Sequence, residues 1–187
     1  MLRRTLIGVV AGTALVLPLT ATTATAAPAA APAVLATTLT YDDSQAAEFK
    51  QAVADGANVW NTNVQNVRIV KAQPGQRANI RIVADNGWPR ATLGPVRPSG
   101  QVTIWMGRQA VQQGYHTVRI AAHEMGHSLG LPDVKPGPCS SLMSGSTGGV
   151  NCTSVNPNAS EKSRVERNYA GTAQQQSSDV VLIDAAF

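Results

Sequence analysis

The stretch His-Glu-Met-Gly-His-Ser-Leu-Gly-Leu-Pro-Asp, residues 123–133, decides both the fold and the chemistry of this chain. Two histidines four positions apart lie on one face of a helix, about 40° apart around its axis. The imidazoles of His123 and His127 can therefore reach the same metal ion. Glu124 stands on the flank of that face, where its carboxylate can meet a water molecule at the metal instead of the metal itself.

The residues that follow the second histidine predict a third ligand. Gly130 occupies a position where helices commonly end in a left-handed residue, which glycine adopts most easily. The chain can then turn back and bring Asp133 toward the metal. Three protein ligands leave the fourth zinc position open for water, which distinguishes a catalytic zinc from a structural one. We therefore predict a catalytic zinc site of the two histidines and Asp133, with Glu124 as the general base.

The hydrophobic pattern around this stretch predicts an α/β domain built on one sheet. The helix carrying the motif is expected over about 117–129, with an apolar face opposite the site made of Val118, Ala122, Met125 and Leu129. An earlier helix ends near Asn63, with N-cap residues at 42–44 and one face made of Phe49, Val53, Ala57 and Trp60. A third helix is expected over about 160–169. Period-two alternation predicts strands at 37–41, 67–70, 80–83 and 102–106, with a surface loop over 87–100. Trp105 has two readings: it helps to form an edge that binds extended substrate, or it packs in the core or at the surface.

The amino terminus predicts export. Arg3 and Arg4 precede an apolar run over 6–19 and a small-residue cleavage site at 24–26, the order of a secretory signal peptide. The run is too short to span a bilayer. We divide the chain into a signal peptide (1–26), a short pro-segment or tether (27–40) and a zinc metalloprotease domain (41–187), and we expect a secreted, extracellular protein.

Charge and cysteine content narrow the partners. The net charge of +4 falls to +2 without residues 1–40, which hold two arginines and no acidic residue, so neither nucleic acid nor membrane is expected as a partner. The two cysteines, Cys139 and Cys152, are an even pair close together in an exported chain, and we predict that they form a disulfide.

Two motifs resemble a known group of enzymes. The pattern from His123 to Asp133 is similar to the extended zinc signature of the metzincin metalloproteases, in the variant with aspartate as the third ligand. The sequence Ser-Leu-Met-Ser-Gly at 141–145, here called the Met-turn segment, resembles the turn that lies beneath the zinc ligands in that clan. With the signal peptide and the cysteine pair, the chain resembles the snapalysin family of small neutral metalloproteases from Streptomyces.

The resemblance implies a metzincin-type α/β (α+β) fold, with a twisted, mixed sheet, an active-site helix, a Met-turn and a C-terminal helix. It implies an endopeptidase that acts on proteins or peptides and prefers an aromatic residue just after the scissile bond. Met143 would support the ligands from below. Lys135 stands where the family has a tyrosine proposed to stabilise the transition state. The resemblance also implies calcium, for which the sequence shows no clear ligands. We further expect a monomer, with a secreted protease inhibitor as a candidate partner besides the substrates.

Two other functions use the same residues. A zinc hydrolase acting on another amide, such as a cell-wall peptide, would need the same metal site and a different cleft. A binding module that has lost activity would keep the fold, but this chain retains Glu124 and all three candidate ligands.

Overall fold

The computed structural model describes residues 36–171 and the two residues of a short strand at 182–183. The predicted signal peptide, the tether up to residue 35 and most of the tail after residue 171 lie outside the described residues. Among the described residues, no helix is both long and apolar enough to cross a membrane.

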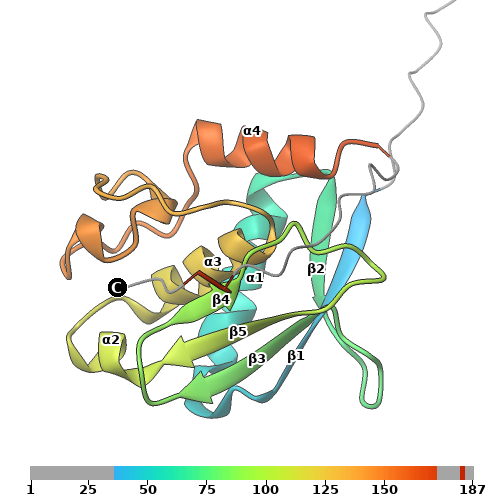
Figure 1. Cartoon of the computed structure of the whole chain (residues 1–187), viewed down its shortest axis with the longest axis horizontal. Helices are drawn as coiled ribbons and strands as arrows, with labels where there is room; N and C mark the ends of the chain where they lie inside the picture. Colours follow the sequence, from blue (N-terminus) through green and yellow to red (C-terminus); the bar gives the residue numbers. More distant parts are fainter. Residues whose placement is uncertain (1–35, 172–181, 184–187) are drawn as a thin grey trace, which may run out of the picture. The chain divides into compact units, whose positions relative to one another are not determined.

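One mixed sheet organises the domain. Its strands are β1 (Thr37–Gln45), β2 (Val67–Lys71), β3 (Ile80–Asp85), β4 (Arg90–Thr92), β5 (Val102–Gly107) and β6 (Leu182–Ile183), in the spatial order β2-β1-β3-β5-β4-β6. The pairs β2–β1, β1–β3 and β3–β5 are parallel, whereas β4 runs antiparallel to both β5 and β6. This mostly parallel sheet with an antiparallel edge confirms the expected metzincin-type α+β architecture (Figure 1).

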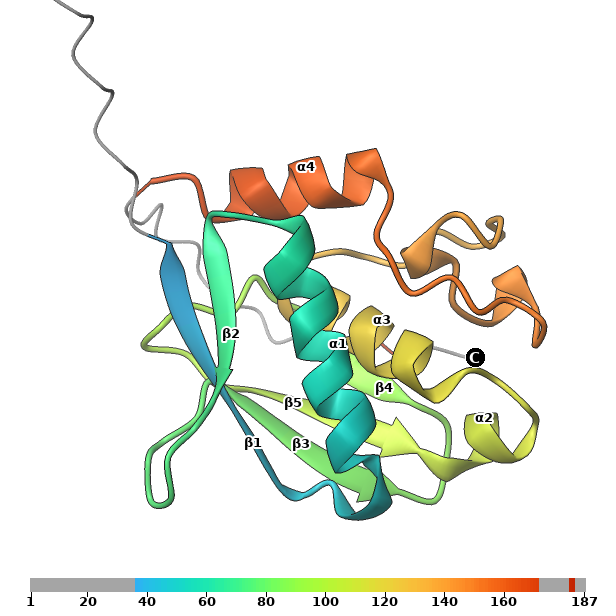
Figure 2. The same cartoon turned by 180° about the vertical axis from the view of Figure 1, so that it is seen from behind.

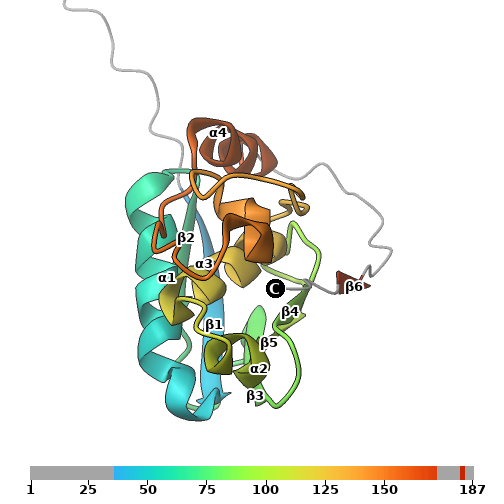
Figure 3. The ribbon, with the colours of Figure 1, turned by 90° about the vertical axis from the view of Figure 1, so that its left-hand side faces the viewer.

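The helices are α1 (Lys50–Asn63), α2 (Arg108–Gln112), α3 (Thr117–Ser128) and α4 (Ala159–Asn168), with short 3₁₀ helices at Ala47–Phe49 and Leu142–Gly148. Figure 2 shows α1 and α3 on the same face of the sheet, and α4 runs past the end of α1 that leads into β2. Seen edge-on, the sheet has both long helices on one side (Figure 3). The three longer helices match the predicted ones, while α2 and the two 3₁₀ helices were not predicted.

The contact between α1 and α3 fixes the motif helix from behind. Along α1 the predicted apolar face is buried, with Val53 and Trp60 fully inaccessible. The Trp60 indole donates a hydrogen bond to the carbonyl of Ala122, 2.8 Å away. Gly56 allows the two helices to approach, because a Cβ there would lie 3.0 Å from the Cβ of Ala121. The face of α3 opposite the histidines is thus anchored in the core.

The predicted helix cap at 42–44 is wrong, because these residues belong to β1. The Asp42 carboxylate accepts the backbone N–H of Ser44 at 2.8 Å, inside a register shift between β1 and β3. Asp43 is buried and pairs with Lys71 of the neighbouring β2 at 2.8 Å. Short acidic side chains can cap a helix, but here they bond to the backbone and to a lysine within an irregular strand.

The prediction of a loop over 87–100 is wrong at β4, a three-residue strand within this range. The prolines and glycines on both sides of β4 made the whole segment look like a loop. Because β4 lies outside β5, Trp105 is not on an edge strand; it stands opposite Arg90, whose guanidinium lies 4.8 Å from the indole ring centre. The start of the domain also needs correction. Residues 37–40, which we assigned to the tether, are the first residues of β1, and Leu39 is fully buried.

Candidate metal centre

Helix α3 carries three of the predicted site residues into the interior. The side chains of His123, Glu124 and His127 are all inaccessible to solvent. The helix begins at Thr117, and the residue before it, His116, is its N-cap: His116 Nδ1 accepts the N–H of Arg119 at 3.3 Å. Four residues of separation then place the two motif imidazoles edge to face, with ring centres 4.6 Å apart.

The turn after α3 delivers the third residue. Gly130 has a φ of +92°, the left-handed conformation predicted for it. A side chain at that position would also collide, since a Cβ would lie 2.7 Å from the amide nitrogen of Asn168 and 2.8 Å from Pro95. The N–H of Leu131 closes the turn on the carbonyl of Gly126 at 2.9 Å. The chain then runs back along the site, which brings Asp133 to the two imidazoles.

Three ligand atoms converge. His123 Nε2 and His127 Nε2 are 3.0 Å apart, and Asp133 Oδ1 lies 3.2 Å from the first and 3.5 Å from the second. These separations match the edges of a tetrahedron of zinc ligands, about 3.3 Å for metal–ligand distances near 2.0–2.1 Å. Among the described residues, this is the one group of three or more His, Cys, Asp or Glu side chains brought within such reach.

The outward-facing ring nitrogens fix the tautomer of both imidazoles in their neutral form. His123 Nδ1 lies 2.9 Å from the carbonyl oxygen of Leu142, and His127 Nδ1 lies 2.7 Å from that of Leu131. A carbonyl can only accept, so each Nδ1 carries a proton, and in a neutral ring Nε2 then keeps its lone pair. Two lone pairs and a carboxylate oxygen at 3.0–3.5 Å repel one another unless a cation lies between them. The donor set, two imidazole nitrogens and one carboxylate oxygen, suits zinc.

The electrostatics of these residues favour metal binding over protonation. Burial lowers the pKa of His123 from its ordinary 6.5 to about 4, so the ring is neutral at physiological pH. Burial by itself would raise the pKa of Asp133, but its interactions with the two imidazoles hold that pKa well below the usual range. His123 and Asp133 therefore present a neutral nitrogen ligand and an anionic oxygen ligand.

Lys135 contacts the third candidate ligand. Its Nζ lies 3.2 Å from Asp133 Oδ2, the oxygen that does not face the histidines. Both side chains are partly exposed, at 23% for the lysine and 19% for the aspartate, so this ion pair lies at the mouth of the site. Lys135, at the position where the resemblance implies a tyrosine, thus touches the carboxylate of the third candidate ligand, a contact that the sequence did not predict.

Met143 lies directly beneath the motif helix. It is fully buried, and a Cβ added to Gly126 would lie 2.7 Å from its sulfur atom. The backbone carbonyl of Met143 accepts the N–H of Val134 at 2.8 Å, which ties the Met-turn segment to the strip that carries Asp133. The motif position between Met125 and His127 therefore has a packing reason to be glycine: a larger residue would displace the methionine.

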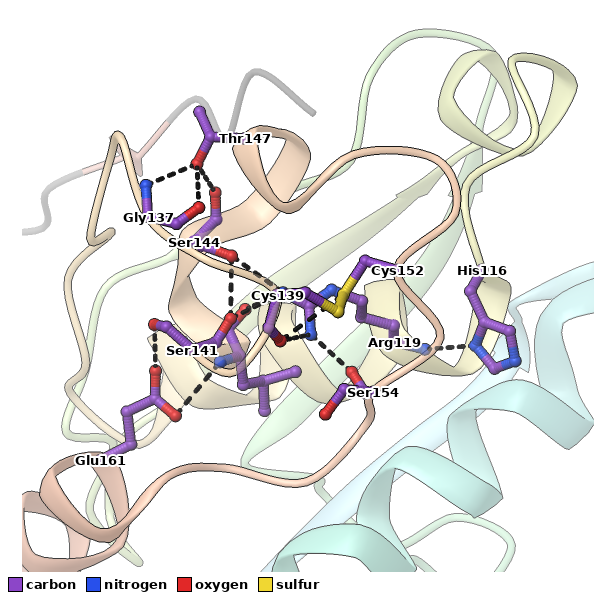
Figure 4. Close-up of a disulfide and its surroundings, with 11 residues drawn as sticks. His116, Arg119, Gly137, Cys139, Ser141, Ser144, Thr147, Cys152, Ser154 and Glu161 are labelled. Carbon is purple, nitrogen blue, oxygen red and sulfur yellow. Dashed lines mark hydrogen bonds between the residues drawn. A yellow bond between two sulfur atoms is a disulfide. The ribbon is translucent and has the colours of Figure 1, made fainter.

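Cys139 and Cys152 form the predicted disulfide, with their Cα atoms 5.5 Å apart. Figure 4 shows the bridge beside the Met-turn segment, together with two buried charged residues that the sequence analysis did not single out, Arg119 and Glu161. One signal could have found Glu161: it stands three residues after Asn158, and the two make a capping box at the start of α4.

The edge of the sheet approaches the same site. Just beyond β4, the N–H of Gly94 donates to the carbonyl of His127 at 2.7 Å, and the N–H of Val96 donates to that of Ser128 at 2.9 Å. A side chain at Gly94 would clash, since a Cβ would lie 2.0 Å from the Ser128 carbonyl oxygen. The antiparallel strand is thereby locked against the carboxyl end of the motif helix.

Comparison with known proteins identifies the family of this chain. Residues 36–172 match the family described as "Streptomyces extracellular neutral proteinase (M7) family". The extracellular small neutral protease of Streptomyces caespitosus is 41% identical over 133 residues, which cover 71% of this chain and 97% of that protein. The protein of the same name from Streptomyces coelicolor is 39% identical over 152 residues, covering 81% of this chain and 68% of that protein.

Proposed function

Because the chain belongs to the Streptomyces extracellular neutral proteinase (M7) family, whose relatives are extracellular neutral proteases, we propose that this secreted peptidase is a zinc-dependent endopeptidase. His123, His127 and Asp133 would hold the ion. The observation that carries this proposal is the convergence of three acceptor atoms within 3.0–3.5 Å, two of them turned inward by backbone carbonyls behind the rings.

Zinc bound by these residues would supply a Lewis acid that polarises a peptide carbonyl and lowers the pKa of water. Glu124 is the general base: its buried carboxylate takes the proton of the attacking water and then passes it to the leaving amine. Lys135 holds Oδ2 of Asp133, which leaves Oδ1 facing the imidazoles. Its ammonium also offsets part of the negative charge that an aspartate ligand brings to the site.

Substrate binds as an extended strand along β4. This strand ends beside the carbonyl of His127, so a peptide paired with its outer edge would run past the metal ligands. The structure already contains a pairing of that kind: β6 is antiparallel to β4, with Ala91 opposite Ile183 and Thr92 opposite Leu182. The outer edge of β4 therefore accepts extended backbone, and β6 would compete with substrate for it.

Three finer parts of the proposal come from the sequence. Residues 1–26 are a signal peptide, and the tether that follows ends before β1. The preference for an aromatic residue just after the scissile bond rests on the family resemblance and is tested with two peptides that differ only in phenylalanine or alanine at that position. Calcium rests on the resemblance alone.

The deciding experiment compares the purified secreted protein with its Glu124→Gln variant, measuring zinc content and hydrolysis of casein in both. We expect one zinc per chain in each, and at least a hundredfold loss of activity in the variant, since a positioned base contributes about 10²–10⁴-fold. Glu48→Gln is the matched control: it makes the same change at an exposed carboxylate outside the candidate site and should keep full activity. Zinc in the parent without proteolysis would refute the endopeptidase assignment.

A further inference from the structure

The Met-turn segment is held from two sides by buried residues of opposite charge. Arg119, on α3, is 3% exposed, and Glu161, on α4, is 5% exposed. Neither belongs to the zinc signature. Burial lowers the pKa of the Arg119 guanidinium, and the negative charge of Glu161 opposes that shift, so each side chain lies within the electrostatic influence of the other.

Arg119 collects carbonyl oxygens. Its Nη2 lies 2.7 Å from the carbonyl of Ser141, 3.4 Å from that of Leu142 and 2.9 Å from the hydroxyl of Ser144. Its Nη1 donates to the carbonyls of Cys139 and Ser154, on the two sides of the disulfide-closed loop (Figure 4). The planar guanidinium is the side chain that can satisfy so many acceptors at once.

Glu161 collects the donors of the same segment. Its Oε1 accepts the hydroxyl of Ser141 at 2.7 Å and the N–H of Met143 at 2.9 Å, while Oε2 accepts the N–H of Leu142 at 3.2 Å. Oε2 also accepts the N–H of Asn158 at 2.7 Å, which completes the capping box of α4. The backbone of the turn is thus fixed by its carbonyls on one side and by its amides on the other.

One of these carbonyls leads to the metal site. The oxygen of Leu142 accepts from Arg119 and is also the acceptor for His123 Nδ1 at 2.9 Å. Arg119 lies one helical turn before His123 on α3, so the arginine and the histidine project from the same side of the helix toward the same turn. Displacing the Leu142 carbonyl would remove the hydrogen bond that sets the protonation and orientation of the His123 ring.

We propose that Arg119 and Glu161 are positioning residues for metal binding: together they hold the Leu142 carbonyl where it orients His123. The inference rests on the proposed function, since it names what sets one ligand of the same site. His127 does not depend on this arrangement, because its Nδ1 is held by the carbonyl of Leu131 in the turn after α3. The two histidines should therefore respond differently when the arginine or the glutamate is changed.

The test uses Arg119→Lys and Glu161→Gln, which keep most of the volume of each side chain and lose part of its hydrogen bonding. Arg97→Lys is the matched control, because Arg97 also donates to a backbone carbonyl, that of Asn168 at 2.8 Å, which lies outside the Met-turn segment. Zinc affinity is measured by competition with a chelator. The first two variants should bind zinc about 10–100-fold more weakly, the usual effect of removing an outer partner of a ligand, and the control should not.

A second readout is independent of the metal. In the metal-free protein, the side-chain ¹⁵N and ¹H resonances of His123 should shift in Arg119→Lys and Glu161→Gln, and those of His127, whose ring lies 4.6 Å away, should shift much less. Unchanged His123 resonances, or equal shifts at both histidines, would overturn the inference and leave a general role in loop stability. A parent that binds no zinc but shows the selective shift would refute the proposed function and keep the positioning role.

Discussion

Removing the disulfide should destabilise the protein without dismantling the metal site. Cys139 and Cys152 are 13 positions apart, so the bridge closes a loop of 14 residues. The chain-entropy relation gives about 3 kcal/mol of stabilisation for a loop of that size at 25 °C. For a domain of this size we expect the melting temperature to fall by about 10 °C when the bond is broken.

The native position of the loop does not depend on the bridge alone. Arg119 still bonds the carbonyls of Ser141 and Leu142, and Glu161 still bonds the N–H groups of the same turn. We therefore expect the reduced protein, below its melting temperature, to bind zinc as the oxidised protein does. The effect of the disulfide lies in the unfolded chain, which has more freedom once the loop is open.

Urea unfolding of the oxidised and the reduced wild-type protein, followed by circular dichroism, measures the difference in their free energies of unfolding. The two proteins have the same side chains and differ only in the disulfide bond. The Cys139→Ala/Cys152→Ala variant serves as an irreversible version, and its extra loss reports the buried sulfur of Cys152. A difference under about 1 kcal/mol between oxidised and reduced wild type would refute the entropy argument. Zinc lost on reduction at 10 °C would show that the bridge, and not the hydrogen bonds, holds the turn.

Two further predictions concern pH and the sheet edge. In the metal-free protein, the pKa of His123 is lowered to about 4 in the native state. As the pH falls below about 6.5, the unfolded chain binds a proton at this histidine and the native chain does not, so the free energy of unfolding decreases as the pH decreases. Between pH 7.5 and 5 the unfolding free energy should drop by about 2 kcal/mol in urea titrations, and a His123→Ala variant that shows the same drop would refute the assignment. Deleting residues 172–187, which removes β6, should lower KM about two- to tenfold at unchanged kcat, since one or two backbone hydrogen bonds no longer compete with substrate. An unchanged KM in a peptide assay would contradict competition at β4.

Much of the fold could be predicted because long, regular patterns identify long elements. The buried faces of α1 and α3 repeat every three or four residues, and β3 and β5 alternate over their whole length. The failures are short elements. β4 has three residues and follows Pro89, too few for any periodicity to appear, and the acidic residues at 42–43 have the same composition whether they cap a helix or stabilise a bulge.

The candidate site also has a part that the sequence predicts and a part that it does not. The atoms that face inward follow from local geometry, because two histidines one turn apart and a glycine in the left-handed conformation place Asp133 next to both rings. The contact of Lys135 with that aspartate was not predicted, because the sequence gives no direction for a side chain on an irregular strip. The motif thus predicts which side chains converge on the site, whereas the tertiary structure determines which other groups contact those side chains.

The Nδ1 atoms of the two histidines, which face away from the site, show how tertiary structure controls the candidate ligands. The rings of His123 and His127 are turned by the carbonyls of Leu142 and Leu131, which any residue type could supply. No sequence pattern can identify a ligand's partner when that partner is a backbone oxygen. What the sequence does contain are the charged side chains that hold such a backbone in place, and in this chain these are Arg119 and Glu161. A buried arginine one turn before the first histidine is therefore evidence about the candidate metal site, although its hydrogen bonds go to backbone carbonyls and a serine hydroxyl, not to the candidate ligands.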